Sequence, residues 1–314
     1  MQLQDKNFST ETLIHPLSLA MNQNRFYIKR DDLLPFSFGG NKARVALNFF
    51  EDLLARGCDT VVTYGSSGSN HCRVVANLAA KYGLNCYIVT PQERYEETYN
   101  SWFVKLFGAQ IVKAPLDFIA QMIDALLEKL SKTCKPYFIP GGGHGNLGTH
   151  AYVDAYDEIC AYEQKNNIRF DYIFHASGTG TTQAGLVCGA VLHNDDPKKI
   201  VGISIARENP RGQQAVESCI RTYLKEVKKM EVEPEIVFDD NYLFDGYACS
   251  DPAIEACIFE TLKQEGIALD PIYTGKAYYG MQRYIEENKI IGKNILFIHT
   301  GGSPLLFDDI GAIK

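Results

Sequence analysis

Short apolar runs alternate with longer amphipathic stretches along most of the chain. The short runs are rich in β-branched and aromatic residues, which favour strands, and the longer stretches repeat apolar residues at helical spacing. Strands are predicted at Phe26–Arg30, Thr60–Tyr64, Cys86–Thr90, Gln110–Lys113, Tyr137–Pro140, Tyr172–His175, Ile200–Ala206 and Ile295–Thr300. Helices are predicted at Lys42–Arg56, Asn70–Tyr82, Leu116–Ser131, Gly148–Gln164, Thr182–His193, Arg211–Lys228, Pro252–Glu265 and Gly275–Glu287. This alternation is typical of parallel sheets covered by helices on both faces.

The positions of the predicted strands divide the chain into two parts. Four strands lie between about Val45 and Gly143, and the others lie before and after this block. We therefore expect a small α/β domain over residues 45–143 and a large α/β domain formed by residues 1–44 and 144–314. The cleft between two such domains is the expected ligand site, because open α/β sheets bind ligands at the carboxyl ends of their strands.

Composition and charge favour a small-molecule partner. The 314 residues carry 31 Lys and Arg against 38 Asp and Glu, which gives a net charge of −7 and argues against nucleic-acid or anionic-membrane binding. The nine cysteines are dispersed without a CxxC pair, so we expect reduced thiols and no metal site. The polar N-terminus and the absence of a long apolar stretch predict a cytoplasmic protein.

The first candidate for chemistry is a lysine at the start of a predicted helix. In the segment Phe38 to Arg44, two glycines precede Lys42. A lysine at such a turn binds a phosphate or forms an imine, although many lysines at helix starts are only solvated charges. The segment is not a Walker A motif, because the spacing and the hydroxyl after the lysine are missing.

Other glycine-rich segments follow predicted strands. Ser66 to Asn70 offers backbone N–H groups to a carboxylate, or it is an ordinary helix N-cap by Ser69 or Asn70. Ser177 to Thr182 combines glycines with threonine hydroxyls and suits a phosphate monoester better than a dinucleotide, since the GxGxxG spacing fails at Gln183. The segment His299 to Pro304 follows the last predicted strand. It lines the same cleft, or it is a plain turn.

Six motifs in order resemble the 1-aminocyclopropane-1-carboxylate deaminase and D-cysteine desulfhydrase family of fold-type II pyridoxal-phosphate enzymes. They are KRDDL (Lys29 to Leu33), FGGNKAR (Phe38 to Arg44), SNH (Ser69 to His71), SGTGTTQAGL (Ser177 to Leu186), DPIYTGKAYYGM (Asp270 to Met281) and HTGG (His299 to Gly302). The resemblance implies two open, mostly parallel three-layer αβα domains of the tryptophan-synthase-β type, with the cofactor in the cleft. It also implies a homodimer.

The resemblance assigns roles to particular residues. Lys42 would carry pyridoxal 5'-phosphate as an imine, Asn70 would lie beside the cofactor hydroxyl, and Thr300 would face the pyridine nitrogen. The cofactor phosphate would be held by Gly178, Thr179, Gly180, Thr181 and Thr182. Lys42, Ser69 and Tyr273 would be catalytic, and Ser69, Asn70, His71 and Tyr273 would bind the substrate. His71 would carry a proton, or it is simply a side chain of the first helical turn.

The implied reaction is a lyase or deaminase reaction on a small amino acid. We expect α,β-elimination on D-cysteine or a similar β-substituted D-amino acid, giving pyruvate, ammonia and the leaving group. Thr274 stands where the ring-opening deaminases of the family carry a glutamate that meets the pyridine nitrogen, and this favours elimination. Deamination of 1-aminocyclopropane-1-carboxylate, β-replacement and non-catalytic binding of the cofactor or a phosphorylated metabolite stay open.

Two departures from the family pattern and one aromatic residue add further expectations. Family members often carry a lysine where this chain has Val45, and a glutamine where it has Gly68. We expect Val45 to remove a phosphate contact and Gly68 to alter the floor of the substrate pocket. Trp102 is expected to pack in the core.

Overall fold

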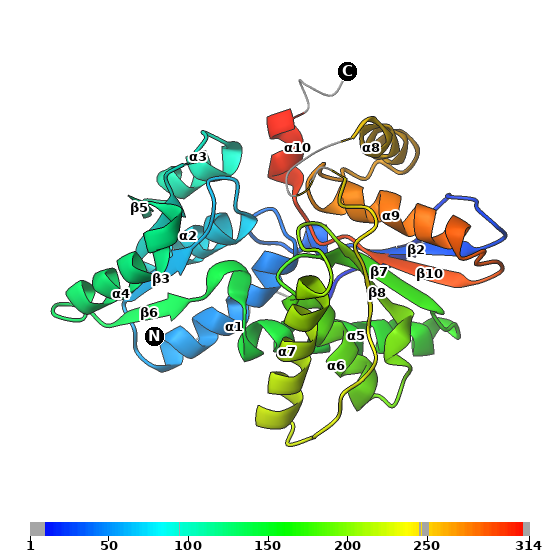
Figure 1. Cartoon of the computed structure of the whole chain (residues 1–314), viewed down its shortest axis with the longest axis horizontal. Coiled ribbons are helices and arrows are strands. Elements are labelled where there is room, and N and C mark those ends of the chain that lie inside the picture. Colours follow the sequence, from blue (N-terminus) through cyan, green and yellow to red (C-terminus); the bar gives the residue numbers. More distant parts are fainter. Residues whose placement is uncertain (1–9, 94, 245, 247–250, 310–314) are drawn as a thin grey trace.

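Two sheets organise the chain in the computed structural model, which describes residues 10–93, 95–244, 246 and 251–309 (Figure 1). The larger sheet has the strand order β1-β2-β10-β7-β8-β9. Its strands are β1 (Ile14–Pro16), β2 (Arg25–Lys29), β7 (Tyr172–Ser177), β8 (Ile200–Ser204), β9 (Val237–Asp239) and β10 (Asn294–Ile298). Neighbouring strands are parallel, except that β1 pairs antiparallel with β2 at the edge.

The smaller sheet is entirely parallel and has the order β5-β4-β3-β6. Its strands are β3 (Thr60–Tyr64), β4 (Asn85–Pro91), β5 (Gln110–Ala114) and β6 (Pro136–Ile139). They are the four strands that the pattern predicts between residues 45 and 143. The domain limits themselves stay a prediction, and the limit between residues 44 and 45 falls inside a helix.

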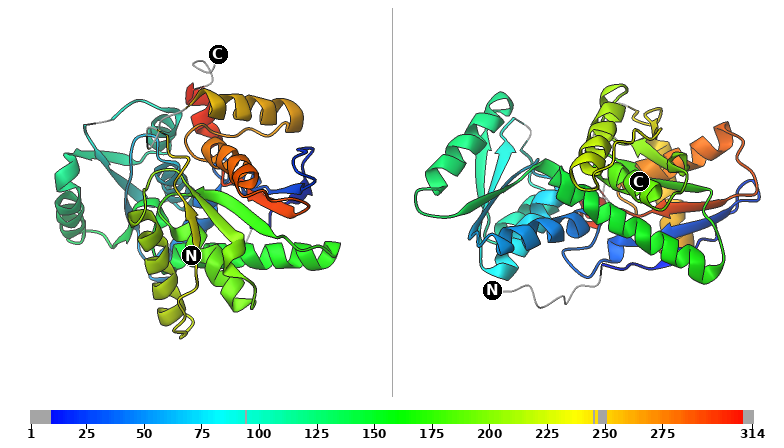
Figure 2. Two further views of the ribbon diagram at one scale, coloured as in Figure 1. Left: turned by 45° about the vertical axis from the view of Figure 1, so that its right-hand side comes forward. Right: turned by 90° about the horizontal axis from the view of Figure 1, so that it is seen from below.

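Helices cover both faces of the larger sheet and flank the smaller one. The helices are α1 (Asn41–Ala55), α2 (Asn70–Tyr82), α3 (Tyr99–Leu106), α4 (Ile119–Leu130), α5 (Asn146–Asn166), α6 (Thr181–Leu192), α7 (Arg211–Glu226), α8 (Pro252–Glu265), α9 (Thr274–Glu287) and α10 (Ser303–Asp309). Helices α1 and α5 pack against each other, and Figure 2 shows the two sheets on either side of this pair.

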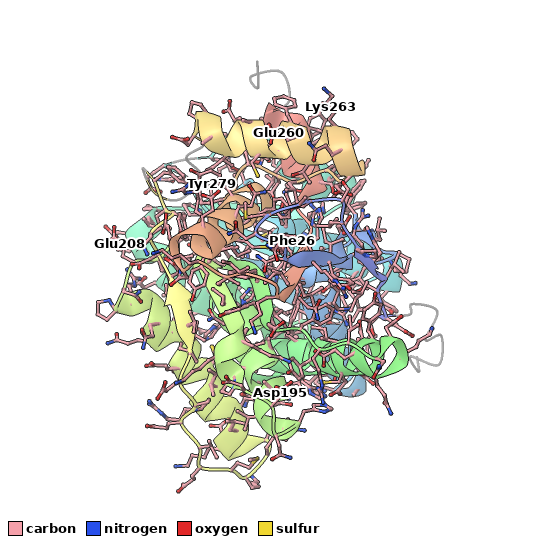
Figure 3. The ribbon with its side chains drawn as sticks, turned by 90° about the vertical axis from the view of Figure 1, so that its right-hand side faces the viewer. Phe26, Asp195, Glu208, Glu260, Lys263 and Tyr279 are labelled. Carbon is pink, nitrogen blue, oxygen red and sulfur yellow. The ribbon has the colours of Figure 1, made fainter. Side chains whose placement is uncertain are left out.

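The apolar core follows the strand period of two. On β10, Leu296 and Ile298 face the cluster formed with α5 and α6, whereas Ile295 and Phe297 face the cluster formed with α8 and α9. Strands buried on both faces read as nearly continuous apolar runs, which explains why they are visible in the sequence. Phe26 of β2 lies in this interior, while Glu260 and Lys263 lie on the outer side of α8 (Figure 3).

The predicted fold class is correct, and each predicted strand and helix is present with its ends shifted by a few residues at most. The prediction misses β1, β9, α3 and α10, which are too short to show a period. The prediction for Trp102 is wrong, because its side chain lies on α3 and is 53% exposed. Within the described ranges, no helix is both long and apolar enough to cross a membrane.

Candidate active site

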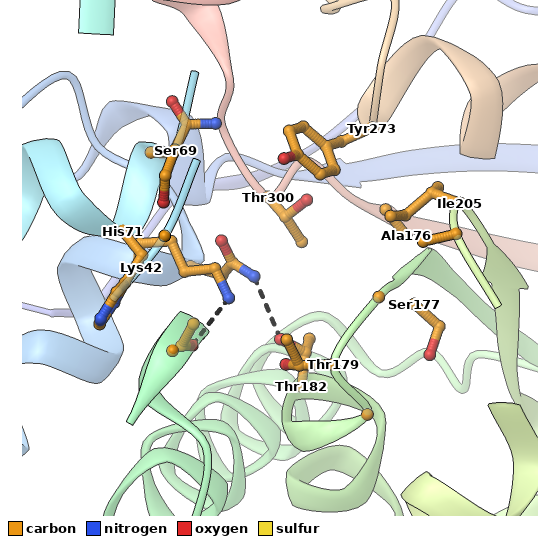
Figure 4. Close-up of a pocket in the computed structure, with 18 of the residues that line it drawn as sticks. Lys42, Ser69, His71, Ala176, Ser177, Thr179, Thr182, Ile205, Tyr273 and Thr300 are labelled. Atoms are coloured by element: carbon orange, nitrogen blue, oxygen red, sulfur yellow. Dashed lines mark hydrogen bonds between the residues drawn. The ribbon is translucent and has the colours of Figure 1, made fainter. Parts of the chain in front are cut away.

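A cavity of about 660 Å³ lies at the carboxyl ends of strands from both sheets. It is lined by the segments after β3 and β6 of the smaller sheet and after β7, β8 and β10 of the larger sheet. Figure 4 shows Lys42, Ser69 and His71 on one side, Thr179 and Thr182 on a second side, and Tyr273 and Thr300 on a third. The site residues predicted from the sequence all line this cavity, with the exception of Thr181.

Lys42 reaches the cavity from the first turn of α1. Gly39 and Gly40 before it have φ of 62° and 92°, and a Cβ on Gly40 would lie 2.7 Å from the carbonyl oxygen of Thr300. Lys42 Nζ donates to the carbonyl oxygen of Gly142 at 2.9 Å. Burial lowers the pKa of Lys42 from 10.5 to about 8. An amine of this kind is partly neutral at mildly alkaline pH, and the neutral form is the nucleophile.

The glycine-rich segment after β7 forms a cradle at the first turn of α6. Gly180 has a φ of 93°, and a Cβ on it would lie 3.1 Å from the backbone nitrogen of Val216 on α7. Thr182 Oγ1 accepts a hydrogen bond from Asn41 Nδ2 at 3.2 Å (Figure 4). Backbone N–H groups at a helix start together with threonine hydroxyls are suited to a phosphate. Thr181 is buried, and its Oγ1 is 3.5 Å from that of Thr179.

The Lys42 amine and this cradle face the same point. A Cβ on Gly142 would lie 2.8 Å from Thr179 Cγ2 and 3.5 Å from Lys42 Nζ. Pyridoxal phosphate carries its aldehyde and its phosphate arm on adjacent ring carbons, so an amine beside a phosphate cradle fits this cofactor. Thr300 adds a neutral hydroxyl at the end of β10. The residues present therefore fit pyridoxal phosphate, with Lys42 for the aldehyde and the Gly178–Thr182 segment for the phosphate.

The segment after β3 serves as a helix cap and as a cavity wall. Ser69 caps α2, because its hydroxyl oxygen accepts from the backbone nitrogen of Cys72 at 3.2 Å. Asn70 Oδ1 accepts from Arg73 at 2.6 Å and from Asn100 at 3.0 Å. These two bonds fix the amide and direct its Nδ2 donor away from them. The N-cap reading is thus correct for Ser69, which also lines the cavity.

His71 lines the cavity and is held as a neutral imidazole. The Thr63 hydroxyl donates its only proton to the carbonyl oxygen of Ile139 at 2.8 Å, so His71 Nε2 must be the donor in its 2.8 Å contact with Thr63. The proton therefore sits on Nε2, and Nδ1 is a lone-pair acceptor. Burial, with a contribution from Lys42, lowers the pKa of His71 to about 3.

Tyr273 projects its hydroxyl into the cavity opposite Lys42 and Ser69 (Figure 4). The turn before α9 is fixed by the buried Asp270 carboxylate, which accepts from the backbone nitrogens of Ile272, Tyr273 and Thr274 at 3.0, 2.8 and 3.0 Å. The Thr274 hydroxyl also donates to Asp270 at 2.7 Å. Thr274 does not line the cavity, so the predicted position of this residue at the pyridine nitrogen is wrong.

The two departures from the family pattern also lie outside the cavity lining. Val45 is buried against Gly143, where a Cβ would lie 2.3 Å from Val45 Cγ1. At Gly68, a Cβ would lie 3.8 Å from a side-chain carbon of Leu305. Gly68 therefore does not form the floor of the pocket, contrary to the prediction.

Sequence reasoning does not identify Arg207 and Arg211, which line the cavity. Arg207 lies on the segment between β8 and α7, and Arg211 is the first residue of α7. It also leaves out Tyr64, at the end of β3, and Ile205, just beyond β8. A signal exists for the arginines, because they follow a predicted strand as the other site segments do. Isolated arginines in a connection carry no local motif that marks them as functional.

Comparisons with known proteins show the family of the chain. The family described as "Pyridoxal-phosphate dependent enzyme" matches residues 10–301. A D-cysteine desulfhydrase from Serratia proteamaculans is 35% identical over 90% of this chain and 87% of its own length. A putative 1-aminocyclopropane-1-carboxylate deaminase from Pyrococcus abyssi is 34% identical over 90% of this chain and 85% of its own length.

Solved structures share the fold. The crystal structure of an ACC deaminase homologue superposes with a TM-score of 0.84 at 33% identity, and covers 96% of this chain and 93% of that chain. An O-ureido-L-serine synthase has a TM-score of 0.69 at 18% identity, covers 96% of this chain and 93% of that chain, and shows the shared fold alone.

Proposed function

The chain belongs to the family of pyridoxal-phosphate dependent enzymes, and from that premise we propose that it removes the β-substituent of a small D-amino acid, such as D-cysteine. The observation that carries this proposal is the partly buried Lys42 amine, which shares one cavity with a phosphate cradle and with the hydroxyls of Ser69 and Tyr273. The products would be pyruvate, ammonia and the leaving group, which is sulfide for D-cysteine.

The residues of the site divide into those that hold the cofactor and those that move protons. Bound pyridoxal phosphate supplies an electron sink for the α-carbon of the substrate. Lys42 would anchor the cofactor, Gly178, Thr179, Gly180 and Thr182 would hold its phosphate, and Asn70 and Thr300 would contact its ring substituents. Thr181 would support this segment from behind, since it does not reach the cavity.

Proton transfer would use the two sides of the cavity. The Lys42 amine takes the proton from the substrate α-carbon. The Ser69 hydroxyl on the same side of the cavity and the Tyr273 hydroxyl on the opposite side hold or return a proton. The bond from the β-carbon to the leaving group breaks, and its electron pair departs with that group. The 2-aminoacrylate that remains hydrolyses to pyruvate and ammonia. Ser69, Asn70 and His71 would contact the substrate at the first turn of α2.

The uncharged surroundings of Thr300 favour elimination over ring opening. Among the described residues, no aspartate or glutamate lines the cavity, so the ring nitrogen would meet the neutral Thr300 hydroxyl. A neutral partner gives a weaker electron sink than a carboxylate does, and a good leaving group such as sulfide needs less assistance than a carbon–carbon bond.

The test is a substrate panel with the purified holoenzyme. D-cysteine, L-cysteine and 1-aminocyclopropane-1-carboxylate are each incubated with it, and pyruvate, sulfide and 2-oxobutanoate are measured. Pyruvate with sulfide from D-cysteine supports the proposal. 2-Oxobutanoate without any pyruvate would replace it by ring opening, the activity named for the putative deaminase from Pyrococcus abyssi. No product from any of them, with the cofactor bound, would favour the non-catalytic binding protein.

We also propose a homodimer formed through α3 and α10, in the cytoplasm. Tyr99, Trp102, Leu106 and Phe307 are each more than half exposed on these two helices, which Tyr99 and Asp308 join by a 2.8 Å hydrogen bond. Exposed apolar side chains of this kind mark interaction surfaces. Light scattering of Trp102→Glu against the unchanged protein tests the interface. A monomeric variant is expected, and an unchanged dimer would place the interface elsewhere.

A further inference from the structure

The charged side chains that line the cavity are all positive among the described residues. Lys42, Arg207 and Arg211 line it, and no carboxylate in the described part of the chain does so. The cofactor phosphate has a cradle of its own, built from backbone N–H groups and neutral hydroxyls at the start of α6. The two arginines are therefore available to a second anion.

Arg207 is held in position rather than free in solvent. The buried Ser204 hydroxyl donates to the backbone oxygen of Arg207 at 2.6 Å and accepts from its backbone nitrogen at 3.1 Å. The guanidinium Nη1 donates to the carbonyl oxygen of Thr179 at 3.1 Å. Asn209, two residues further on, is tied to Asp240 through its backbone nitrogen at 2.7 Å and its Nδ2 at 3.0 Å. The segment between β8 and α7 is thus anchored at both ends.

Arg211 adds a second positive charge close to the first. It is the first residue of α7, and within the described ranges it forms no ion pair. Burial and then the charge of Arg211 lower the pKa of Arg207. Two like charges beside one cavity repel each other, and an anion bound between them relieves that repulsion.

We propose that Arg207 and Arg211 bind an anionic side chain of the substrate, so that the enzyme acts on amino acids whose β-substituent is a phosphate or a similar oxyanion. The inference rests on the proposed elimination and adds its substrate class. Two guanidinium groups match an oxyanion in charge and in hydrogen-bond geometry. Arg207 contacts Thr179 of the cofactor cradle and lines the same cavity as the Lys42 amine, so the two arginines do not form a remote site.

The arginines would also stabilise the departing group. The α-carbon loses its proton to the base, the bond from the β-carbon to oxygen breaks, and the electron pair stays on the oxygen of the departing oxyanion. The two guanidinium groups would stabilise its negative charge by hydrogen bonds. Water then hydrolyses the 2-aminoacrylate. For a serine phosphate ester the sum is one ester and one water giving one pyruvate, one ammonia and one phosphate, with no oxidant or reductant.

The experiment compares two substrates of the same skeleton, O-phospho-D-serine and O-acetyl-D-serine, by their kcat/KM values for pyruvate formation. The holoenzyme is expected to prefer the phosphate ester. Arg207→Gln with Arg211→Gln is expected to lower the phosphate-to-acetate ratio about tenfold, the scale of one hydrogen bond to a charged group, because Arg207 is only partly buried and Arg211 is exposed. The lysine variants at both positions should restore part of the ratio. Arg221→Gln is the matched control, because Arg221 lies on the same helix, outside the cavity, and pairs with Glu233 at 3.1 Å.

Two results would overturn the inference while the proposed elimination stands. One is pyruvate from the acetate ester with no preference for the phosphate ester. The other is a double variant that binds pyridoxal phosphate more weakly in an absorbance titration and keeps the substrate ratio, which would assign the arginines to the cofactor phosphate. If neither ester is turned over, the elimination itself fails. Binding of O-phospho-D-serine, followed by the cofactor absorbance, then still tests the arginines, because the double variant should lose it.

Discussion

The first turn of helix α1 carries two basic residues, Lys42 and Arg44, whose electrostatic environments differ. Lys42 faces the cavity, where its nearest hydrogen-bond partner is a carbonyl oxygen and burial lowers its pKa to about 8. Arg44 lies in a closed cluster and bonds Asp31 at 3.0 Å and Glu158 at 2.5 Å. Burial alone would lower the pKa of Arg44, but these two carboxylates raise it above its usual value.

The comparison shows that α1 is fixed to the rest of the fold through one face and carries the reactive amine on the other. In the cluster, Lys29 also pairs with Glu158, and the Tyr152 hydroxyl donates to Asp31 at 2.7 Å. The cluster therefore joins β2, α1 and α5 with its charges balanced, and it fixes the start of α1. On the cavity side, Lys42 has no carboxylate partner among the residues that the structure describes, and it keeps a reactive amine. The ion pairs of Arg44 on one face of α1 thus hold the helix in place, and the helix in turn positions the Lys42 amine on its other face.

The largest expected effect comes from removing the unpaired charge. Lys42→Ala should lower kcat/KM for pyruvate formation by at least about 10³-fold, because it deletes the base and the cofactor anchor together. The urea unfolding midpoint should not fall, since no ion pair is lost. Activity within tenfold of the unchanged enzyme would remove Lys42 from the chemistry.

Breaking the paired face should damage stability rather than chemistry. Arg44→Met leaves Asp31 and Glu158 without their main partner and should cost about 3–5 kcal/mol of unfolding free energy, as expected for a broken buried pair. Urea unfolding measures it. Arg56→Met is the control, because Arg56 pairs with Asp52 on the exposed surface. An equal loss of unfolding free energy in Arg44→Met and Arg56→Met would contradict a special role of the buried cluster.

The two faces should also respond differently to pH. The folded apoprotein releases the Lys42 proton above about pH 8, whereas the unfolded chain keeps it up to about pH 10.5. The free energy of unfolding should therefore rise between these two pH values, by up to about 3 kcal/mol. Lys42→Met should lack this rise. Parallel stability curves for Lys42→Met and the unchanged apoprotein would count against an unpaired Lys42.

Asp31 on the paired face titrates at acid pH instead. Burial raises the pKa of Asp31, but Arg44 and Lys29 lower it well below its usual range. Its contribution to the free energy of unfolding is therefore lost as pH falls below about 4.

A smaller effect is expected at the edge of the cluster. The Thr12 hydroxyl accepts from Lys29 at 2.6 Å and donates to Asp31 at 2.7 Å. Thr12→Val should cost about 1–2 kcal/mol, the value of hydrogen bonds to charged groups, and should leave kcat/KM intact. Thr133→Val, at an exposed position, is the control. A loss of activity with unchanged stability would show that the cluster acts on the chemistry directly.

The sequence predicts most of the fold and the backbone segments of the site, because strand periods and glycine-rich strand ends are local features. Lys42, Ser69 and the Gly178–Thr182 segment stand in such places, and the structure brings them together. The direction of a side chain is set by distant partners and is harder to predict. Thr274 turns to Asp270 because that carboxylate collects the N–H groups of the turn.

The two arginines are hard to predict for a different reason. Arg207 and Arg211 gain their place in the site only because β8 lies beside β7 in the larger sheet, which brings the two strand ends together. Strand order is a property of the whole sheet and not of any short segment. Trp102 shows a related limit, since helical spacing alone does not tell an exposed face of a helix from a buried one.

The most direct measurement is the visible absorption spectrum of the protein with pyridoxal phosphate, recorded before and after addition of D-cysteine while pyruvate is assayed, with Lys42→Ala in parallel. The account predicts an imine band that requires Lys42 and that changes as pyruvate accumulates. An equal band in Lys42→Ala, or an imine band in the unchanged protein that no β-substituted amino acid alters, would contradict it.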